Sequence, residues 1–499
     1  MGIVIRQSIK STVWAYVGVA LGTITTLWLY PKFLTPAQLG LTMGVMLPLA
    51  SILAQFALLG TTNAAFYFAS HFRNDAVHQP RFIQFLFRLM LVGLACISIL
   101  YIFCKPLFVR LYSDHSQLFI DYYWWVLPLT IFVVGYTFLE AFIRSQKEIV
   151  FTNFTREVLL RLLSIAILVL YIFHFISFQT FVIAFVFSWL ILFLTLFVFS
   201  LNEPWFQWSN NTSINHIAAK KEIFKYGALN VMSTAAWALA GNIDSLMIAK
   251  YIGLSDAGVF RLAVFICSVI QVPQRTMTQI ILPILSEHWQ NNVVEKIDEL
   301  YKKSALQLII VGSFLVMLVI VNIDSFLQIL PTSYSSSGAT KWVVILLCLA
   351  RLIDMATSIN GEIIQTSKFF RFNFYFIIAL LIFTVIANYL LIPQYGIIGS
   401  ALAGMIVVVL FNVFKYLFVL YKFKLQPITK ECFIALGLAV VAGCAVYFIP
   451  TIIHPIITIA IKSGIATIIF GLSLTLLKIS PEINHLLSKV FHKISPKKN

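Results

Sequence analysis

A set of polar residues interrupts an apolar segment between positions 262 and 285. At helical spacing these residues share one face, which holds Ser268, Gln271, Arg275, Thr278 and Gln279, with Gln274 beside it. An arginine inside a membrane span costs ~2.5–3.5 kcal/mol on insertion scales, so such a face must meet protein or water. Either this helix is a kinked structural helix covered by its neighbours, or Arg275 and the glutamines line a cavity and contact an anionic substrate.

A second polar face lies between positions 341 and 364. Its members are Arg351, Asp354, Ser358, Glu362 and Gln365. Arg351 and Asp354 are three residues apart, so they can pair on one helix. One interpretation is an ion pair that locks helices together. The other gives Arg351 a role in substrate binding and makes Asp354 and Glu362 candidates for ion coupling.

The segment 226–249 holds one carboxylate, Asp244, on a face with Asn230, Thr234, Trp237 and Gly241. Asp244 is a candidate for proton or sodium binding, a structural partner for Arg275 or Arg261, or a protonated residue without a role. Asn230 and Trp237 are candidate substrate contacts, and the ring of Trp237 could stack on a sugar. Tyr16, in the segment 12–30, is a third candidate of this kind.

Two prolines lie in segments of similar character. Pro273 interrupts the face that carries Arg275, and Pro48 interrupts the segment 41–66, whose polar face contains Ser51, Gln55 and Thr62. Proline removes a backbone donor and frees a carbonyl group. Interrupted helices at corresponding positions of two halves indicate a binding site, so Gln55 joins the candidate substrate contacts.

The elements that must position these residues are membrane spans. The chain of 499 residues is 60% hydrophobic and 11% charged, which is typical of a polytopic membrane protein. Helical periodicity without alternating strands predicts an all-α fold. Fourteen apolar ranges are long enough to be spans: 12–30, 41–66, 83–104, 118–140, 157–174, 178–200, 226–249, 262–285, 305–330, 341–364, 373–392, 396–420, 431–449 and 455–477.

The distribution of charge orients these spans. With the N-terminus in the cytoplasm, most of the 35 Lys and Arg residues fall on cytoplasmic segments. Both termini are then cytoplasmic, and the basic tail contacts anionic lipid. The scattered cysteines and the histidines show no ligand spacing, so no metal is expected. No nucleotide-binding loop, nucleophile elbow or soluble acid pair is present, so we expect neither an enzyme nor a cofactor.

An internal repeat divides the chain. At a nearly constant separation Gly22 matches Gly241, Gly40 matches Gly258, and Trp125 matches Trp342. Two six-helix units in the same orientation would be related by an axis along the membrane normal, with a site between them. The expected organisation is an N-terminal lobe (1–200), a cytoplasmic linker (201–225), a C-terminal lobe (226–420), two further helices (421–478) and a basic cytoplasmic tail (479–499).

The connections after the first and seventh spans carry a family resemblance. Residues 34–41 (LTPAQLGL) and 253–260 (GLSDAGVF) resemble the corresponding connections of the multidrug/oligosaccharidyl-lipid/polysaccharide exporter superfamily, and within it bacterial polysaccharide flippases of the Wzx type. The resemblance implies two six-helix lobes around a cavity lined by helices 1, 2, 7 and 8. It also implies an anionic glycan on polyprenyl diphosphate as substrate, moved across the bacterial cytoplasmic membrane, with membrane lipids, a polysaccharide polymerase and glycosyltransferases as partners and no nucleic acid.

Three alternatives remain at this point. Drug antiporters of the superfamily place an acid in an early helix, and spans 1 and 2 have none. Lipid II flippases have fourteen spans and basic residues in the first helix, whereas span 1 has none after Lys10. A membrane-embedded glycosyltransferase needs a sizeable outer loop with a catalytic acid or base, and the predicted outer loops are short.

Overall fold

The computed structural model describes residues 13–14, 16–72, 78–146, 148–203, 206, 217–335, 338–450 and 454–479. All regular elements among these residues are helices, which confirms the all-α prediction. Much of the predicted linker and the basic tail after residue 479 lie outside the described residues.

The helices are long and apolar enough to make a multi-pass membrane protein. Within the described residues eight helices qualify as spans, and up to ten if two bent pairs each count as one. The 54-residue helix α21 (Phe370–Phe423) counts once, although it bends at Gly396, which has φ 61° and ψ −139°. Its two arms correspond to two predicted spans, whereas the predicted range 226–249 is divided at Gly241–Asn242 and the range 341–364 at Ser358. The total of fourteen spans stays a prediction.

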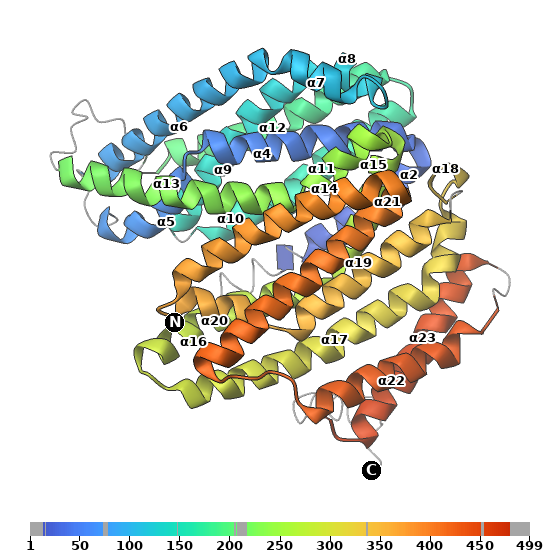
Figure 1. Ribbon diagram of the computed structural model, residues 1–499. Helices are drawn as coiled ribbons and strands as arrows, with labels where there is room; N and C mark the ends of the chain where they lie inside the picture. The colour runs from blue at the N-terminus through green and yellow to red at the C-terminus, as the bar shows by residue number, and fades with distance from the viewer. Residues whose placement is uncertain are drawn as a thin grey trace, which may run out of the picture. The chain divides into compact units, whose positions relative to one another are not determined.

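The chain forms two compact units, Met1–Leu262 and Ala263–Asn499. Among its described residues the first unit contains three π-helical segments and one short 3-10 helix. Its other elements are α-helices, most of which are labelled in Figure 1. In chain order these are η1 (Ile24–Leu29), α2 (Tyr30–Phe33), α3 (Pro36–Leu39), η2 (Gly40–Met46), α4 (Leu47–Ala57), α5 (Thr61–Phe72), α6 (His78–Phe103), α7 (Lys105–Tyr112), α8 (Gln117–Asp121), η3 (Tyr123–Trp125), α9 (Val126–Ser145), α10 (Ile149–Asn153), η4 (Phe154–Leu159), α11 (Leu160–Ile172), α12 (Phe178–Leu201), α13 (Ile217–Ala240) and α14 (Ile243–Tyr251). Helix α15 (Leu254–Ile270) begins in this unit and continues into the second.

The second unit is built on the 36-residue helix α17 (Val294–Ile329). The other elements are α16 (Val272–Gln290), α18 (Thr332–Ser335), α19 (Ala339–Ala356), α20 (Asn360–Thr366), α21, α22 (Lys430–Tyr447) and α23 (Pro455–Leu476). Figure 1 shows α22 and α23 beside α17. The buried face of α22 carries Ala435, Ala439 and Ala442, and small side chains let helices approach closely in a membrane.

Glycines bring the two motif-bearing connections together within the first unit. A Cβ added at Gly40 would lie 1.8 Å from the carbonyl oxygen of Leu254, and one at Gly258 would lie 2.1 Å from that of Pro36. No side chain fits at either position, so the backbones touch. Gly40 and Gly258 are matched positions of the predicted repeat, and their mutual contact gives that match a physical reason.

Of the two predicted proline interruptions, the one at Pro273 coincides with a bend. Pro273 is the second residue of α16, after a 47° bend from α15. Pro48 is the second residue of α4, directly after the π-helical segment η2, but Pro36–Ala57 is one continuous helix there. Proline lacks the N–H that an α-helix interior requires, and both prolines lie in the first turn of an α-helix, where that donor is not needed.

Candidate functional site

The polar face of the eighth predicted span lies on α16, next to its break. Gln271 is the N-cap of α16, and the side chains of Gln271 and Gln274 are half-buried. Arg275 and Gln279 are exposed further along the same helix. The structure therefore divides the predicted face into a buried part that contacts protein and an exposed part.

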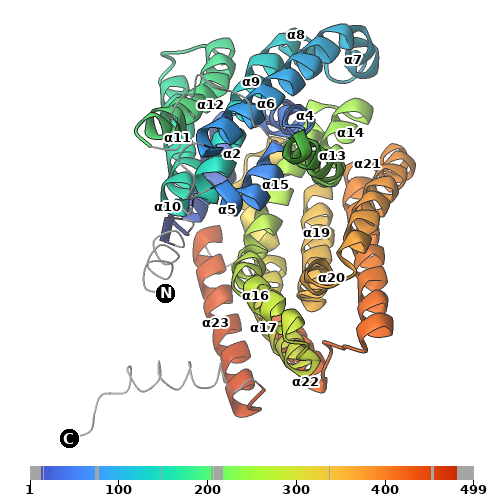
Figure 2. The ribbon, with the colours of Figure 1, turned by 90° about the vertical axis from the view of Figure 1, so that its left-hand side faces the viewer.

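The buried part meets Asp354 near the end of α19. The amides of Gln271 and Gln274 donate to Oδ2 of Asp354 at 3.4 and 3.3 Å. Asn412 of α21 donates to Oδ1 at 3.0 Å. Three neutral amides from two helices thus hold one carboxylate and occupy three of its roughly four acceptor sites without an ion pair. Figure 2 shows the elements that carry these residues, α16, α19 and α21.

Glu362 of α20 extends this polar network. Its Oε1 accepts a hydrogen bond of 3.2 Å from the hydroxyl of Thr278 on α16. Lys415 of α21 is 8% exposed and interacts electrostatically with both Asp354 and Glu362. The Lys415 ammonium lies 4.1 Å from the ring centroid of Phe411. In this network of the second unit, two carboxylates, Asp354 and Glu362, share one buried cation, Lys415. The network could therefore accommodate a further positive charge.

The predicted pairing of Arg351 with Asp354 is wrong. Among the described residues no ion pair or hydrogen bond joins the two side chains, and Nε of Arg351 is buried without a hydrogen-bond partner. The helix also does not continue to Glu362. Ser358 has φ 52°, and α19 and α20 meet at 47° around it, so Asp354 and Glu362 lie on separate helices. Asp354 is thereby directed to α16 and α21.

The remaining candidates lie in the first unit. Tyr16 and Trp237 expose 56% and 59% of their surface, as a ring that stacks on a ligand requires. Gln55 and Asn230 are half-buried on α4 and α13. Asp244 is in the first turn of α14, after a break at Gly241–Asn242, where the helix dipole favours a carboxylate.

Arg261 has defined partners close to Asp244. Its Nη2 donates to Asn242 at 2.8 Å and its Nε to the carbonyl oxygen of Met43 at 2.8 Å. Arg261 also interacts electrostatically with Asp244. Of the two predicted partners of Asp244, Arg261 thus lies in the same unit, and the pairing with Arg275 stays a prediction.

The first unit has its own charged cluster on α9 and η4. Oε1 of Glu140 lies 2.8 Å from Nη2 of Arg144, and Oε2 lies 3.2 Å from Nη1 of Arg156. Arg144 also donates to Thr152 at 3.1 Å and to Asn153 at 2.7 Å. Two guanidinium groups therefore neutralise one carboxylate that is 5% exposed.

Asn412, Lys415 and Arg156 belong to these clusters but were not among the candidates predicted from the sequence. Lys415 lies inside the predicted span 396–420. Asn412 and Lys415 are three residues apart on α21, so a polar pair inside an apolar span was the available signal.

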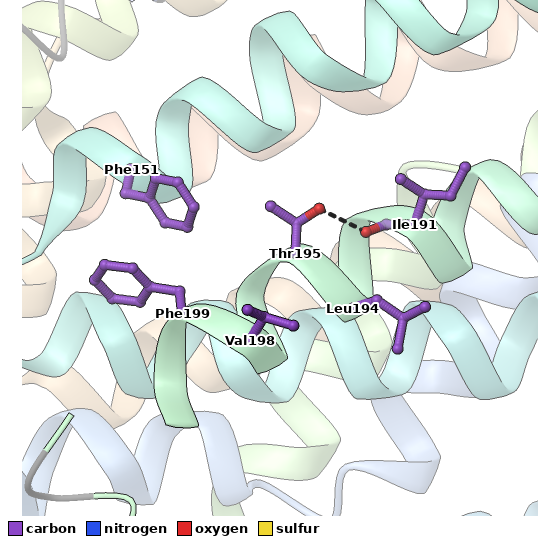
Figure 3. Close-up of a pocket in the computed structure, with 6 residues that line it drawn as sticks. All are labelled: Phe151, Ile191, Leu194, Thr195, Val198 and Phe199. Carbon is purple, nitrogen blue, oxygen red and sulfur yellow. Dashed lines mark hydrogen bonds between the residues drawn. The ribbon is translucent and has the colours of Figure 1, made fainter. Parts of the chain in front are cut away.

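Figure 3 shows a surface depression that none of these residues line. Its walls are Phe151 of α10 and the side chains of Ile191, Leu194, Thr195, Val198 and Phe199 on α12. The Thr195 hydroxyl donates to the carbonyl oxygen of Ile191 at 2.7 Å. The depression has an apolar lining and offers no charged group to a substrate.

Comparisons with known proteins place this geometry in a fold. No family model matches the chain. The capsular polysaccharide biosynthesis protein CapF of Staphylococcus aureus is 24% identical over 188 residues, which are 38% of this chain and 47% of that protein. The chain thus matches about half the length of this curated relative.

Solved structures match much more of the chain. The lipid II flippase MurJ in an inward closed conformation has a TM-score of 0.71 at 14% identity, covering 94% of this chain and 99% of its own. An inward-facing multidrug resistance transporter of the MATE family has a TM-score of 0.65 at 15% identity, covering 82% and 98%. A transporter from Pyrococcus furiosus has a TM-score of 0.58 at 14% identity, covering 84% and 95%. The chain is therefore a polytopic membrane protein with the fold of the MOP superfamily transporters.

Proposed function

We propose that this protein moves an oligosaccharide linked to polyprenyl diphosphate from the inner to the outer leaflet of the bacterial cytoplasmic membrane. The observation that carries the proposal is the extent of the structural match. A lipid II flippase aligns with 94% of the chain, whereas the multidrug transporter above aligns with 82%. A flippase layout thus accounts for more of the chain than a drug-transporter layout.

The cargo is argued from charge and from the distant relative. The net charge of +16 and the exposed Arg275 favour an anionic group, and a guanidinium binds a phosphate through two parallel hydrogen bonds. The curated relative is described as a capsular polysaccharide biosynthesis protein. Lipid II is the second candidate cargo, because the solved structure with the TM-score of 0.71 is a lipid II flippase.

Each unit would offer its own candidate substrate contacts, which differ in chemistry. Arg275, with Gln279 on the same helix, would bind the diphosphate, and Arg351 would add a second guanidinium. Tyr16 and Trp237 would stack on sugar rings, and Gln55 and Asn230 would hydrogen-bond to sugar hydroxyls. Gln271 and Gln274 would act through Asp354, since their amides already donate to it.

Alternating access against a gradient needs an energy source. Neutral donors, amides and a hydroxyl, hold the carboxylates Asp354 and Glu362. Either carboxylate can therefore gain a proton or a sodium ion without breaking an ion pair of the kind that holds Glu140. Asp244 is the corresponding candidate in the first unit. Coupling through these residues would change the charge of the network during each transport cycle.

The topology of the proposed flippase places both termini in the cytoplasm. Reporter fusions after Lys32, Asp114 and Pro393 should then score as extracytoplasmic. Cytoplasmic scores at two of these positions would contradict the topology and the internal repeat together.

Transport itself is tested with purified protein in proteoliposomes that contain a fluorescent polyprenyl diphosphate glycan. A membrane-impermeant quencher measures how much labelled lipid reaches the outer leaflet. We expect faster movement than in empty vesicles, a loss in Arg275→Ala, partial recovery in Arg275→Lys, and full activity in the control Arg110→Ala.

Two further cargoes complete this experiment. Labelled lipid II tests the second candidate, and a cationic dye tests the drug-antiporter alternative. Movement of lipid II at a higher rate than the glycan would favour the second candidate. Movement of the dye alone would contradict the proposed function.

A further inference from the structure

The helix that precedes η1 packs one face on η4 and α11. Trp14, Gly18 and Gly22 lie four residues apart on that face. The Trp14 and Phe154 rings meet edge to face, with centroids 5.1 Å apart. A Cβ at Gly18 would lie 2.5 Å from Cβ of Glu157, so only glycine permits this close approach.

One turn further, Gly22 faces a guanidinium. A Cβ at Gly22 would lie 3.2 Å from Nε and 3.3 Å from Cζ of Arg161 on α11. The missing side chain thus leaves room for Arg161 against the first helix. Tyr30, which begins α2 after η1 and is 2% exposed, also interacts electrostatically with Arg161.

The positive charge of Arg161 lacks a carboxylate partner within the described residues. Nε of Arg161 is buried and makes no hydrogen bond there. Glu157 lies one turn earlier, but no ion pair joins it to Arg161 in the described part of the chain, whereas Glu140 pairs with Arg144 and Arg156. A buried donor without a partner is costly unless a ligand satisfies it.

We propose that Arg161 forms an anion-binding subsite against Gly22, and that its ligand is the phosphate group of a polyprenyl diphosphate lipid. A guanidinium matches phosphate geometry and holds its charge in an apolar setting better than an ammonium. The helix that precedes η1 has no cation in its described part, and Arg161 of α11 supplies one beside it. This assignment rests on the proposed function for the identity of the lipid.

The test is a binding measurement on the purified full-length protein with undecaprenyl diphosphate as the probe. Arg161→Gln should weaken binding about tenfold, since a hydrogen bond to a charged group is lost. Arg161→Lys should recover part of the affinity, and Gly22→Ala should weaken binding because its Cβ crowds the guanidinium. Arg110→Gln, at an exposed position on α7, should bind like the wild type.

Two further ligands identify the source of the anion. Undecaprenol, which lacks phosphate, should bind equally to the wild type and to Arg161→Gln. An equal loss of undecaprenol binding would mean that Arg161 acts through structure and would overturn the proposal. Equal competition by phosphatidylglycerol would also overturn it, because the site would then serve any anionic lipid.

Binding and transport separate the two proposals. If Arg161→Gln binds undecaprenyl diphosphate like the wild type while the glycan is transported, the subsite fails and the proposed function stands. If the wild type transports no lipid-linked glycan but its binding still depends on Arg161, the proposed function fails and the subsite remains.

Discussion

The two units hold their carboxylates in opposite ways: Glu140 of the first unit is buried, whereas Asp354 and Glu362 of the second are half-buried. In the first, Glu140 has two guanidinium partners at 2.8 and 3.2 Å. In the second, Asp354 has three amide donors, and it shares one buried ammonium, Lys415, with Glu362. A carboxylate between two cations stays ionised, because its protonation would leave both cations without a counterion. A carboxylate held by amides can change its charge at lower cost, as an ion-coupling site requires.

The first prediction concerns the ion-paired cluster and has the largest expected effect. Glu140→Gln should lower the free energy of unfolding by about 2 kcal/mol, since Arg144 and Arg156 lose their counterion but remain partly exposed. Thermal unfolding in detergent measures the change. The control Glu299→Gln removes an exposed ion pair with Lys303 and should cost much less, because solvent screens an exposed pair. Equal losses in both variants would show that the Glu140 cluster stabilises no more than a surface pair.

The second prediction concerns Thr278, whose hydroxyl donates to Glu362. Thr278→Val keeps the shape of the side chain and should cost about 1 kcal/mol through the lost hydrogen bond to a charged group. Thr467→Val is the matched control, because the Thr467 hydroxyl donates at an exposed position to the backbone carbonyl of Ser463. A smaller loss of stability for Thr278→Val than for Thr467→Val would contradict a stabilising hydrogen bond between Thr278 and Glu362.

The third prediction has the smallest expected effect on stability. Asp354→Asn keeps the size of the side chain and one acceptor for the surrounding amides, so the free energy of unfolding should change by less than about 1 kcal/mol. The same thermal assay measures this change beside Glu140→Gln. A loss as large as that of Glu140→Gln would mean that Asp354 is a structural ion and would erase the difference between the clusters.

Sequence reasoning predicted those parts of the fold and site that depend on one helix at a time. Apolar length predicted a polytopic helical protein, and Pro273 predicted the bend between α15 and α16, whereas the helix at Pro48 continues from η2 into α4. The break at Ser358 was missed because serine is uncommon at φ 52°, so its residue type carries no signal. The partners of Asp354 were assigned wrongly because helical spacing identifies neighbours on the same helix only. Gln271 and Gln274 come from α16, and Asn412 comes from α21, far along the chain.

We propose that Asp354 serves ion coupling while Glu140 serves stability. The most direct measurement compares transport by the wild type and Asp354→Asn in proteoliposomes with an imposed proton or sodium gradient. Rates are normalised to folded protein, and the gradients are then collapsed with ionophores. We expect the wild type to slow when the coupling gradient collapses, and Asp354→Asn to move the labelled lipid slowly with or without it. Transport by Asp354→Asn at the wild-type rate, with an unchanged response to the ionophores, would contradict the claim.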